Sequence, residues 1–147
     1  MRERAVILLV EDNPNDELLT VRALKKHGFD QGLVVARDGA EALDYLFASG
    51  PYSGHDGLRV PRVILLDLKL PKVDGLEVLR RVRQDERTSH IPIVVLSSSI
   101  EERDLVASYE QGANSYVRKP VNFDSFVEAM RHLGAYWLTL NEVVGQT

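Results

Sequence analysis

Short, uninterrupted runs of apolar residues recur along this chain, separated by longer segments in which apolar positions have a helical spacing. The apolar runs are typical of strands buried on both faces, and they span residues 5–10, 33–36, 63–66, 91–96 and 116–117. In the longer segments apolar residues recur every three or four positions, which favours amphipathic helices. Residues that suit a helix start precede these segments: Asn13, Asp38, Asp74, Ser99 and Asn122.

Strand and helix alternate along the whole chain in this interpretation. The alternation predicts an α/β fold, in which a five-stranded parallel sheet is covered by helices on both faces. We expect the flavodoxin-like strand order 2-1-3-4-5, with an extended C-terminal helix. In such sheets, ligands bind beyond the carboxyl ends of the strands, where the strand order reverses. Strands 1 and 3 flank that point.

Acidic residues follow two of the apolar runs. Glu11 and Asp12 come directly after residues 5–10, and Asp67 comes directly after residues 63–66. If these two strands lie side by side, three carboxylates meet at one edge of the sheet. Close like charges repel, and burial disfavours an ionised carboxylate, so this edge requires a cation.

The ends of two further strands add the hydroxyl of Ser97 and the positive charge of Lys119. Carboxylates suit Mg²⁺, which prefers one or two of them together with water and phosphate oxygens. A metal ion and a lysine would neutralise an incoming phosphoryl group, and Asp67 could attack phosphorus to give an acyl phosphate. Taken singly, each residue has a structural alternative, such as a helix cap for Asp12 or a solvated side chain for Lys119.

Composition narrows the class of protein. The 147 residues correspond to one domain, Cys is absent, and the net charge is −4 with a pI of about 5.6. An acidic chain argues against nucleic acid as the main partner, and we interpret Arg80, Arg81, Arg83 and Arg87 as a solvated helix face. No apolar run reaches the roughly 18 residues of a membrane span. We expect a cytoplasmic protein with no nucleic-acid or membrane partner.

Four motifs occur in a fixed order: Val10-Glu11-Asp12-Asn13, Leu66-Asp67-Leu68-Lys69-Leu70-Pro71 with Asp74-Gly75, Val95-Leu96-Ser97, and Tyr116-Val117-Arg118-Lys119-Pro120. With these motifs the chain resembles, over about residues 5–133, the receiver domain of two-component response regulators. The resemblance implies a phosphorylation switch rather than an enzyme. A sensor histidine kinase would donate a phosphoryl group to Asp67, and the domain would assist only this transfer and its own dephosphorylation.

The resemblance also implies a metal site. Mg²⁺, or Mn²⁺ in its place, would be bound directly by Asp12, Asp67 and the backbone carbonyl of Lys69, and through water by Glu11.

Further roles follow from the same resemblance. Ser97, Ser98 and Lys119 would contact phosphoryl oxygens, and Ser97 and Tyr116 would move as the switch. The peptide bond before Pro120 would be cis.

Within this family the chain looks most like the small stand-alone regulators paired with phytochrome-type histidine kinases. This finer likeness depends on the loop at residues 50–61 and on residues 133–138 with Asn141. It implies a single receiver domain over residues 1–147, with no output domain, that signals through protein–protein interaction.

The last helical segment is expected to run from Asn122 to about Val144, with a core to residue 133 and an extension over about 134–145. A helix of this length spans about 34 Å, more than the ~17–20 Å of a strand, so its apolar stripe would overhang the sheet. We therefore expect a homodimer, with interface candidates that lie along this stripe: Phe126, Met130, Leu133, Trp137 and Leu140. The alternative is that Gly134 ends the packed helix.

Two rival functions would use a similar site or the same strand order. A Mg²⁺-dependent phosphohydrolase of the aspartyl-phosphate kind would carry a second Asp two residues after Asp67, where this chain has Lys69. A flavin-binding electron carrier would need a phosphate-binding loop after the first strand, where Glu11 and Asp12 would repel a phosphate.

Overall fold

A five-stranded parallel sheet forms the centre of the protein, in the strand order β2-β1-β3-β4-β5. The computed structural model describes residues 6–54, 60–119 and 122–143. The strands are β1 (Ile7–Val10), β2 (Leu33–Ala36), β3 (Val63–Leu66), β4 (Ile93–Ser97) and β5 (Ser115–Arg118). The predicted fold class and strand order are confirmed.

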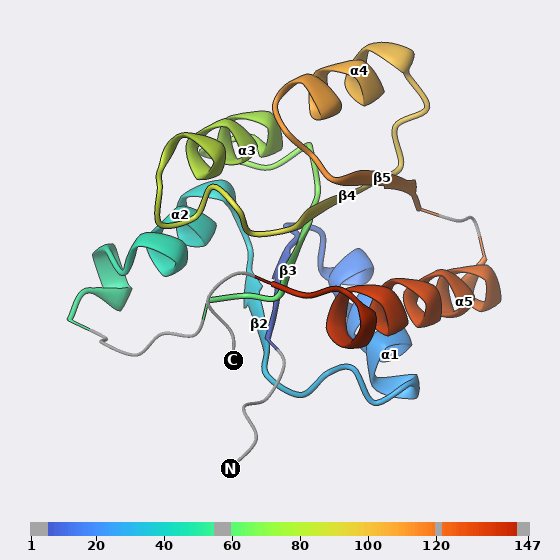
Figure 1. The fold of residues 1–147 in the computed structure, drawn as a ribbon. Coiled ribbons are helices and arrows are strands. Elements are labelled where there is room, and N and C mark those ends of the chain that lie inside the picture. Colours follow the sequence, from blue (N-terminus) through green and yellow to red (C-terminus); the bar gives the residue numbers. More distant parts are fainter. Residues whose placement is uncertain (1–5, 55–59, 120–121, 144–147) are drawn as a thin grey trace.

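Helices cover both faces of the sheet. They are α1 (Pro14–Lys26), α2 (Gly39–Phe47), the short η1 (Gly50–Tyr52), α3 (Gly75–Gln84), α4 (Glu102–Glu110), α5 (Phe123–Gly134) and η2 (Ala135–Leu140). Helices α1 and α5 lie on one face, and α2, α3 and α4 lie on the other (Figure 1). No helix of the described part of the chain is both long and apolar enough to cross a bilayer.

The uninterrupted apolar runs are explained by this two-sided cover. In β1, Ile7 and Leu9 face the core beneath α1 and α5, whereas Leu8 and Val10 face the core beneath α2 and α3. All residues of β1, β3 and β4 are buried. Because successive strand residues point to opposite faces, a strand covered on both sides favours apolar residues along nearly its whole length.

Side-chain caps fix the starts of four helices. The Asn13, Asp38, Asp74 and Asn122 side chains accept hydrogen bonds from backbone N–H groups in the first turns of α1, α2, α3 and α5. The prediction that Ser99 caps the fourth helix is wrong. Glu101 is the first residue before α4, and the Ser99 hydroxyl instead accepts a hydrogen bond from Glu101 N–H and donates one to Asp104.

The C-terminal helix is extended, but it ends at Leu140 rather than near Val144. Asn141 has an extended backbone, and its carbonyl accepts a 3.2 Å hydrogen bond from Arg62. Phe126 and Met130 are 6% and 0% exposed and pack against the sheet. The prediction that these two side chains lie on a dimer surface is therefore wrong, because their stripe covers the protein's own core.

The residues at the far end of the apolar stripe differ in their exposure to solvent. Leu133 and Trp137 are half-buried against the same core, whereas Leu140 is 72% exposed. Of the predicted interface residues, only Leu140 is therefore largely open to solvent.

Arg83 joins three segments at the edge of α3. Its guanidinium donates to the backbone carbonyls of Gly112, Ser89 and Ile91 at 2.9, 2.9 and 2.8 Å, and to the side chain of Asn114 at 2.8 Å. The interpretation of Arg83 as part of a solvated helix face is therefore wrong. The spacing of apolar residues on α3 could not reveal partners that lie in other segments.

Replacing Arg83 by Met should lower the free energy of unfolding by about 2–4 kcal/mol, because four acceptors lose a charged donor. Arg81→Met is the matched control. Among the described residues Arg81 pairs only with Glu77 on its own helix, and its side chain is half exposed, so we expect a change of about 0.5 kcal/mol or less. Urea unfolding of both variants measures the difference, and equal losses would contradict the structural role of Arg83.

Candidate functional site

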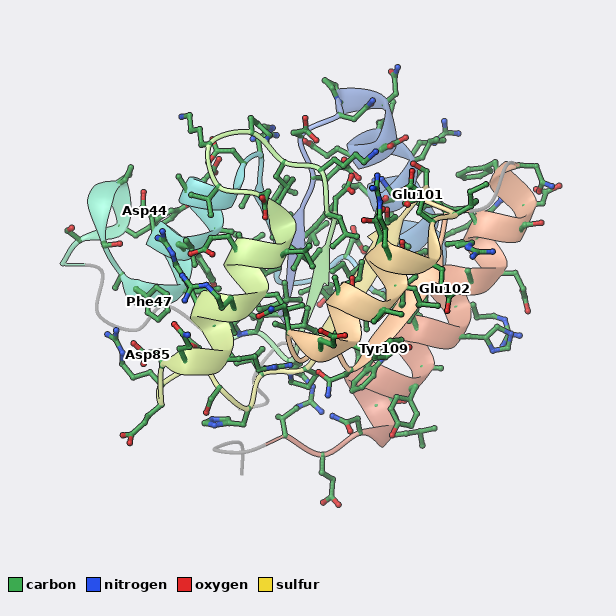
Figure 2. All side chains as sticks on the ribbon, turned by 90° about the horizontal axis from the view of Figure 1, so that it is seen from above. Asp44, Phe47, Asp85, Glu101, Glu102 and Tyr109 are labelled. Carbon is green, nitrogen blue, oxygen red and sulfur yellow. The ribbon has the colours of Figure 1, made fainter. Side chains whose placement is uncertain are left out.

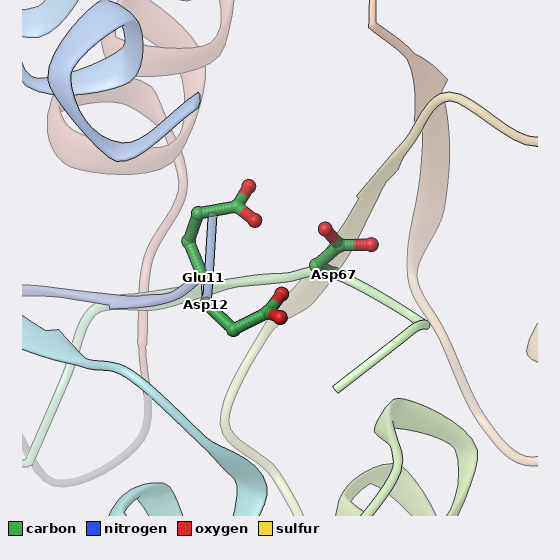
Figure 3. A group of neighbouring side chains, drawn as sticks. All are labelled: Glu11, Asp12 and Asp67. Carbon is green, nitrogen blue, oxygen red and sulfur yellow. The ribbon is translucent and has the colours of Figure 1, made fainter. Parts of the chain in front are cut away.

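The acidic residues after β1 and β3 meet at the carboxyl edge of the sheet. The two strands are neighbours, with Val10 opposite Leu66, so the residues that follow them emerge together. The Asp67 N–H donates to the Val10 carbonyl at 3.1 Å and extends this pairing. Carboxylate oxygens of Glu11, Asp12 and Asp67 all lie within 4.8 Å of one another. Figure 3 shows the three carboxyl groups gathered at this edge.

Lys119 brings a positive charge into this group. Its ammonium donates to Glu11 Oε1 at 2.6 Å and to Asp67 Oδ2 at 3.1 Å. The end of β5 places it there, because Lys119 N–H continues the pairing with β4 by donating to the Ser97 carbonyl at 2.9 Å. The Lys119 and Glu11 side chains are only 10% and 1% exposed, so their ion pair is largely withdrawn from water.

Burial and charge shift the protonation of this pair. Burial raises the pKa of Glu11 to about 7, although the hydrogen bond from Lys119 opposes the shift. Burial lowers the pKa of Lys119, but the hydrogen bond to Glu11 and the charges of Asp67 and Glu11 outweigh it, so its pKa is raised overall. Lys119 therefore stays protonated at neutral pH and supplies the cation that this edge needs.

The donor set fits a hard divalent cation. The cluster offers carboxylate oxygens only, as Mg²⁺ and Mn²⁺ prefer, and no His or Cys belongs to it among the described residues. Asp12 is exposed and Asp67 is partly exposed, so an ion can approach from solvent. Lys69 is also exposed, and its backbone N–H donates to Asp67 Oδ1 at 3.3 Å.

The hydroxyl residues at this edge lie in different surroundings. Ser97 is 2% exposed, and its Oγ accepts a 3.1 Å hydrogen bond from Ser99 N–H. Ser98 is exposed. Tyr116 is half-buried, and its hydroxyl donates to the Ser99 carbonyl at 3.3 Å. Ser97 and Tyr116 thus both contact the loop between β4 and α4, while Pro120 lies outside the described residues.

The loop after Asp67 is held by a close backbone contact at Gly75. Gly75 N–H donates to the Leu68 carbonyl at 2.8 Å. A Cβ atom at position 75 would lie 2.3 Å from the Asp67 carbonyl oxygen and 2.6 Å from Leu68 Cα. Only glycine lets α3 begin directly against the Asp67 backbone, which explains the Asp74-Gly75 pair at this spacing.

Asp16 is a site residue that the sequence interpretation missed. It lies in the first turn of α1, and its Oδ2 accepts a 3.0 Å hydrogen bond from the Lys119 ammonium. No sequence pattern marked it, because an acidic residue in the first turn of a helix is common and its partner Lys119 lies 103 residues further along the chain.

Comparison with known proteins agrees with the resemblance to response regulator receiver domains. The family model of the response regulator receiver domain matches residues 7–131. Response regulator Rcp1 of Synechocystis is 40% identical over 133 residues, which cover 90% of this chain and 88% of that protein. The probable methanogenesis regulatory protein FilR2 of Methanothrix harundinacea is 42% identical over 140 residues, covering 95% and 88%.

Solved structures agree with this fold. The phosphorylated cyanobacterial phytochrome response regulator RcpA matches with a TM-score of 0.89 at 37% identity, over 97% of this chain and 100% of that chain. The Mn²⁺-bound form of Rcp1 matches with a TM-score of 0.84 at 38% identity, over 95% and 98%. The bacteriophytochrome response regulator AtBRR is 55% identical, with a TM-score of 0.76, over 96% and 100%. The chain therefore belongs to the response regulator receiver-domain family, whose function is to accept phosphoryl groups in signalling.

Proposed function

We propose that Asp67 is the phosphoryl acceptor of a magnesium-dependent signalling switch that is driven by a sensor histidine kinase. The observation that carries the proposal is the meeting of three carboxylates and a buried lysine at the carboxyl edge of β1 and β3. Asp67 is 14% exposed at its side chain, so it is open to a donor at the surface and still partly shielded from water.

In the transfer, a bond forms between an Asp67 carboxylate oxygen and phosphorus. The bond from phosphorus to the nitrogen of the kinase phosphohistidine breaks, and the imidazole keeps its electron pair. Asp67 then no longer carries its carboxylate charge, so the Lys119 ammonium can donate to a phosphoryl oxygen from nearly the same place. The Ser97 hydroxyl can donate to another after it releases Ser99 N–H.

Asp12, Asp67 and the Lys69 carbonyl would hold Mg²⁺, with Glu11 acting through water. The bound ion supplies positive charge that offsets the acidic cluster and the phosphoryl group. The Mn²⁺-bound form of Rcp1, a relative of the same fold, supports this choice of metal.

A chain of contacts leads from Ser97, at the end of the strand beside β3, towards α4. Ser97 contacts Ser99 N–H, the Tyr116 hydroxyl donates to the Ser99 carbonyl, and the Ser99 hydroxyl donates to Asp104 in the first turn of α4. Movement of Ser97 towards the phosphoryl group would therefore release the loop that positions α4. Figure 2 shows α4 at the surface with Tyr109 near its end, and Tyr109 is 49% exposed. A partner protein can read such a change.

Consumption of a small acyl phosphate, measured against protein concentration, separates the switch from its rivals. With Mg²⁺ present, the switch takes up one phosphoryl group per chain on Asp67 and releases it slowly by its own dephosphorylation. Rapid multiple turnover of phosphate esters would instead support a phosphohydrolase. A yellow protein with a flavin spectrum would support the electron carrier.

The donor kinase belongs to a phytochrome-type photoreceptor in this proposal, and the transfer takes place in the cytoplasm. The names of the matched regulators RcpA and AtBRR support this choice, since both refer to phytochromes. Transfer from several purified, phosphorylated histidine kinases would be compared over short times. A phytochrome-type kinase should phosphorylate the chain fastest, and equal rates from unrelated kinases would contradict the assignment.

A second copy of the chain is the proposed partner of the C-terminal segment. Leu140 and Tyr136 on η2 are 72% and 49% exposed, and together they form an apolar surface beyond the core.

Leu140→Asp should weaken self-association at least ~tenfold, because it places a charge in an apolar contact. Leu18→Asp, at a residue 56% exposed on α1, is the control. Light scattering with and without beryllofluoride measures the mass, and a monomeric wild type in both states would contradict the dimer.

A further inference from the structure

The Lys119 ammonium has no spare donor in this structure. An ammonium group has three N–H donors, and three carboxylates lie within hydrogen-bond distance of Lys119 Nζ: Glu11 at 2.6 Å, Asp16 at 3.0 Å and Asp67 at 3.1 Å. Any contact between Lys119 and a phosphoryl oxygen must therefore replace one of these three. The other two then decide where the ammonium stays.

Asp16 differs from the other two acceptors. It lies outside the group of three carboxylates that can share a metal ion, and it belongs to α1 rather than to a strand end. Glu11 and Asp67 are the groups that metal binding and phosphoryl transfer engage. Asp16 alone can keep its hydrogen bond to Lys119 unchanged throughout the reaction.

The backbone of Asp16 is held in place from both sides. Its N–H donates to the capping Asn13 side chain at 3.1 Å, and its carbonyl accepts from the Thr20 hydroxyl at 2.8 Å. A cavity of about 60 Å³ lies beside Asp16 and Lys119, with Phe123 and Phe126 among its lining residues. The ammonium therefore has room to move away from the acceptor if nothing restrains it.

We propose that Asp16 is a positioning residue for phosphoryl transfer, which holds the Lys119 ammonium at the acceptor while Asp67 and Glu11 change partners. This inference rests on the proposed role of Asp67. Its action is through Lys119, and Asp16 itself touches neither the phosphoryl group nor the metal ion.

The first test measures the rate of Asp67 phosphorylation by a small acyl phosphate at fixed, saturating Mg²⁺. Asp16→Ala should lower the rate at saturating donor about tenfold and leave the half-saturating donor concentration nearly unchanged, because positioning acts in the transition state. Asp16→Asn keeps an acceptor oxygen and should recover most of the lost rate. It also guards against a fault in folding, since the side chain keeps its size.

Glu17→Ala is the matched control, because Glu17 lies in the same first turn of α1 but pairs with Arg37. It removes the same charge from the helix N-terminus but keeps the Asp16–Lys119 hydrogen bond. The rate of phosphorylation should therefore be unchanged. A loss as large as that of Asp16→Ala would assign the effect to the helix and overturn the inference.

The decisive test is a double-mutant cycle. In a chain that already carries Lys119→Met, Asp16→Ala should have no further effect on the rate, because its target is absent. If the rate losses of Asp16→Ala and Lys119→Met are additive while the wild type is labelled on Asp67, the inference is overturned and the proposed function is left intact. A wild type that takes up no phosphoryl group on Asp67 would overturn the proposed function, and the inference with it.

Discussion

Asp67→Asn should abolish phosphorylation of the chain, with a rate at least ~10³-fold below that of the wild type. The amide has nearly the shape of the carboxylate but lacks its nucleophilic oxygen, so the site can fold without accepting phosphorus. Intact mass spectrometry after incubation with an acyl phosphate and Mg²⁺ measures the uptake. The wild type should gain one phosphoryl group and the variant none.

The matched control for this change is Asp38→Asn. Asp38 caps α2 by accepting a 2.7 Å hydrogen bond from Glu41 N–H, and Asn can accept the same bond. This variant should be labelled as fast as the wild type. Full labelling of Asp67→Asn would show that the acceptor is a different residue. Equal loss in both variants would show that the loss is not specific to Asp67 and would also contradict the assignment.

Lys119→Met should have the second largest effect. Removing one charged donor from a phosphoryl-transfer site costs about 10²–10³-fold in rate. The same change leaves the buried Glu11 beside Asp67 without a cation, and breaking a buried ion pair typically costs about 3–5 kcal/mol of unfolding free energy. Added Mg²⁺ should therefore raise the melting temperature of the variant more than that of the wild type.

The pH dependence of this variant has a definite sign. Burial raises the pKa of Glu11 above its unfolded value even with Lys119 present, to about 7, and the loss of the ammonium can only raise it further. A carboxyl group with a raised pKa in the folded state stabilises the protein below its unfolded pKa, and this stability is lost as pH rises through the folded pKa. The metal-free variant should therefore be less stable at pH 8 than at pH 5.

Lys72→Met provides the control for Lys119→Met. The Lys72 side chain is 70% exposed, and its Nζ lies 3.5 Å from Asp38 Oδ2, so the loss of unfolding free energy should be below about 1 kcal/mol. Thermal unfolding of the two variants with and without Mg²⁺ makes the comparison. If, in the absence of metal, Lys119→Met is as stable as the wild type, Lys119 does not offset the charges of Glu11 and Asp67 as proposed.

The strand ends were predictable because two independent signals agree there. An apolar run such as residues 63–66 indicates a strand buried on both faces, and the acidic residue that follows marks its exit from the core. Parallel strands all leave the core at the same edge, so Glu11 and Asp67 had to meet once β1 and β3 were known to be neighbours. Lys119 emerges at the same edge from β5, and its long side chain reaches both. The cluster therefore follows from the sequence and the topology together.

Features that depend on contacts between distant segments could not be predicted from the sequence. Asp16 has the composition of an ordinary first-turn residue, and only its distance to Lys119 marks it as part of the site. The apolar stripe at Phe126 and Met130 has the same spacing whether it faces the protein's own sheet or a second copy. Ser99 matched a capping pattern, but its hydroxyl already bonds Asp104, and α4 begins later.

Diffraction from crystals grown with Mn²⁺ and beryllofluoride would test whether Asp12 and Asp67 form one metal and phosphoryl site, because anomalous scattering locates the metal independently of the protein coordinates. We expect one strong Mn²⁺ peak bonded to carboxylate oxygens of Asp12 and Asp67, with beryllofluoride bonded to Asp67 and the Lys119 ammonium directed at the beryllofluoride. A Mn²⁺ peak away from these carboxylates, with beryllofluoride absent from Asp67, would contradict this expectation.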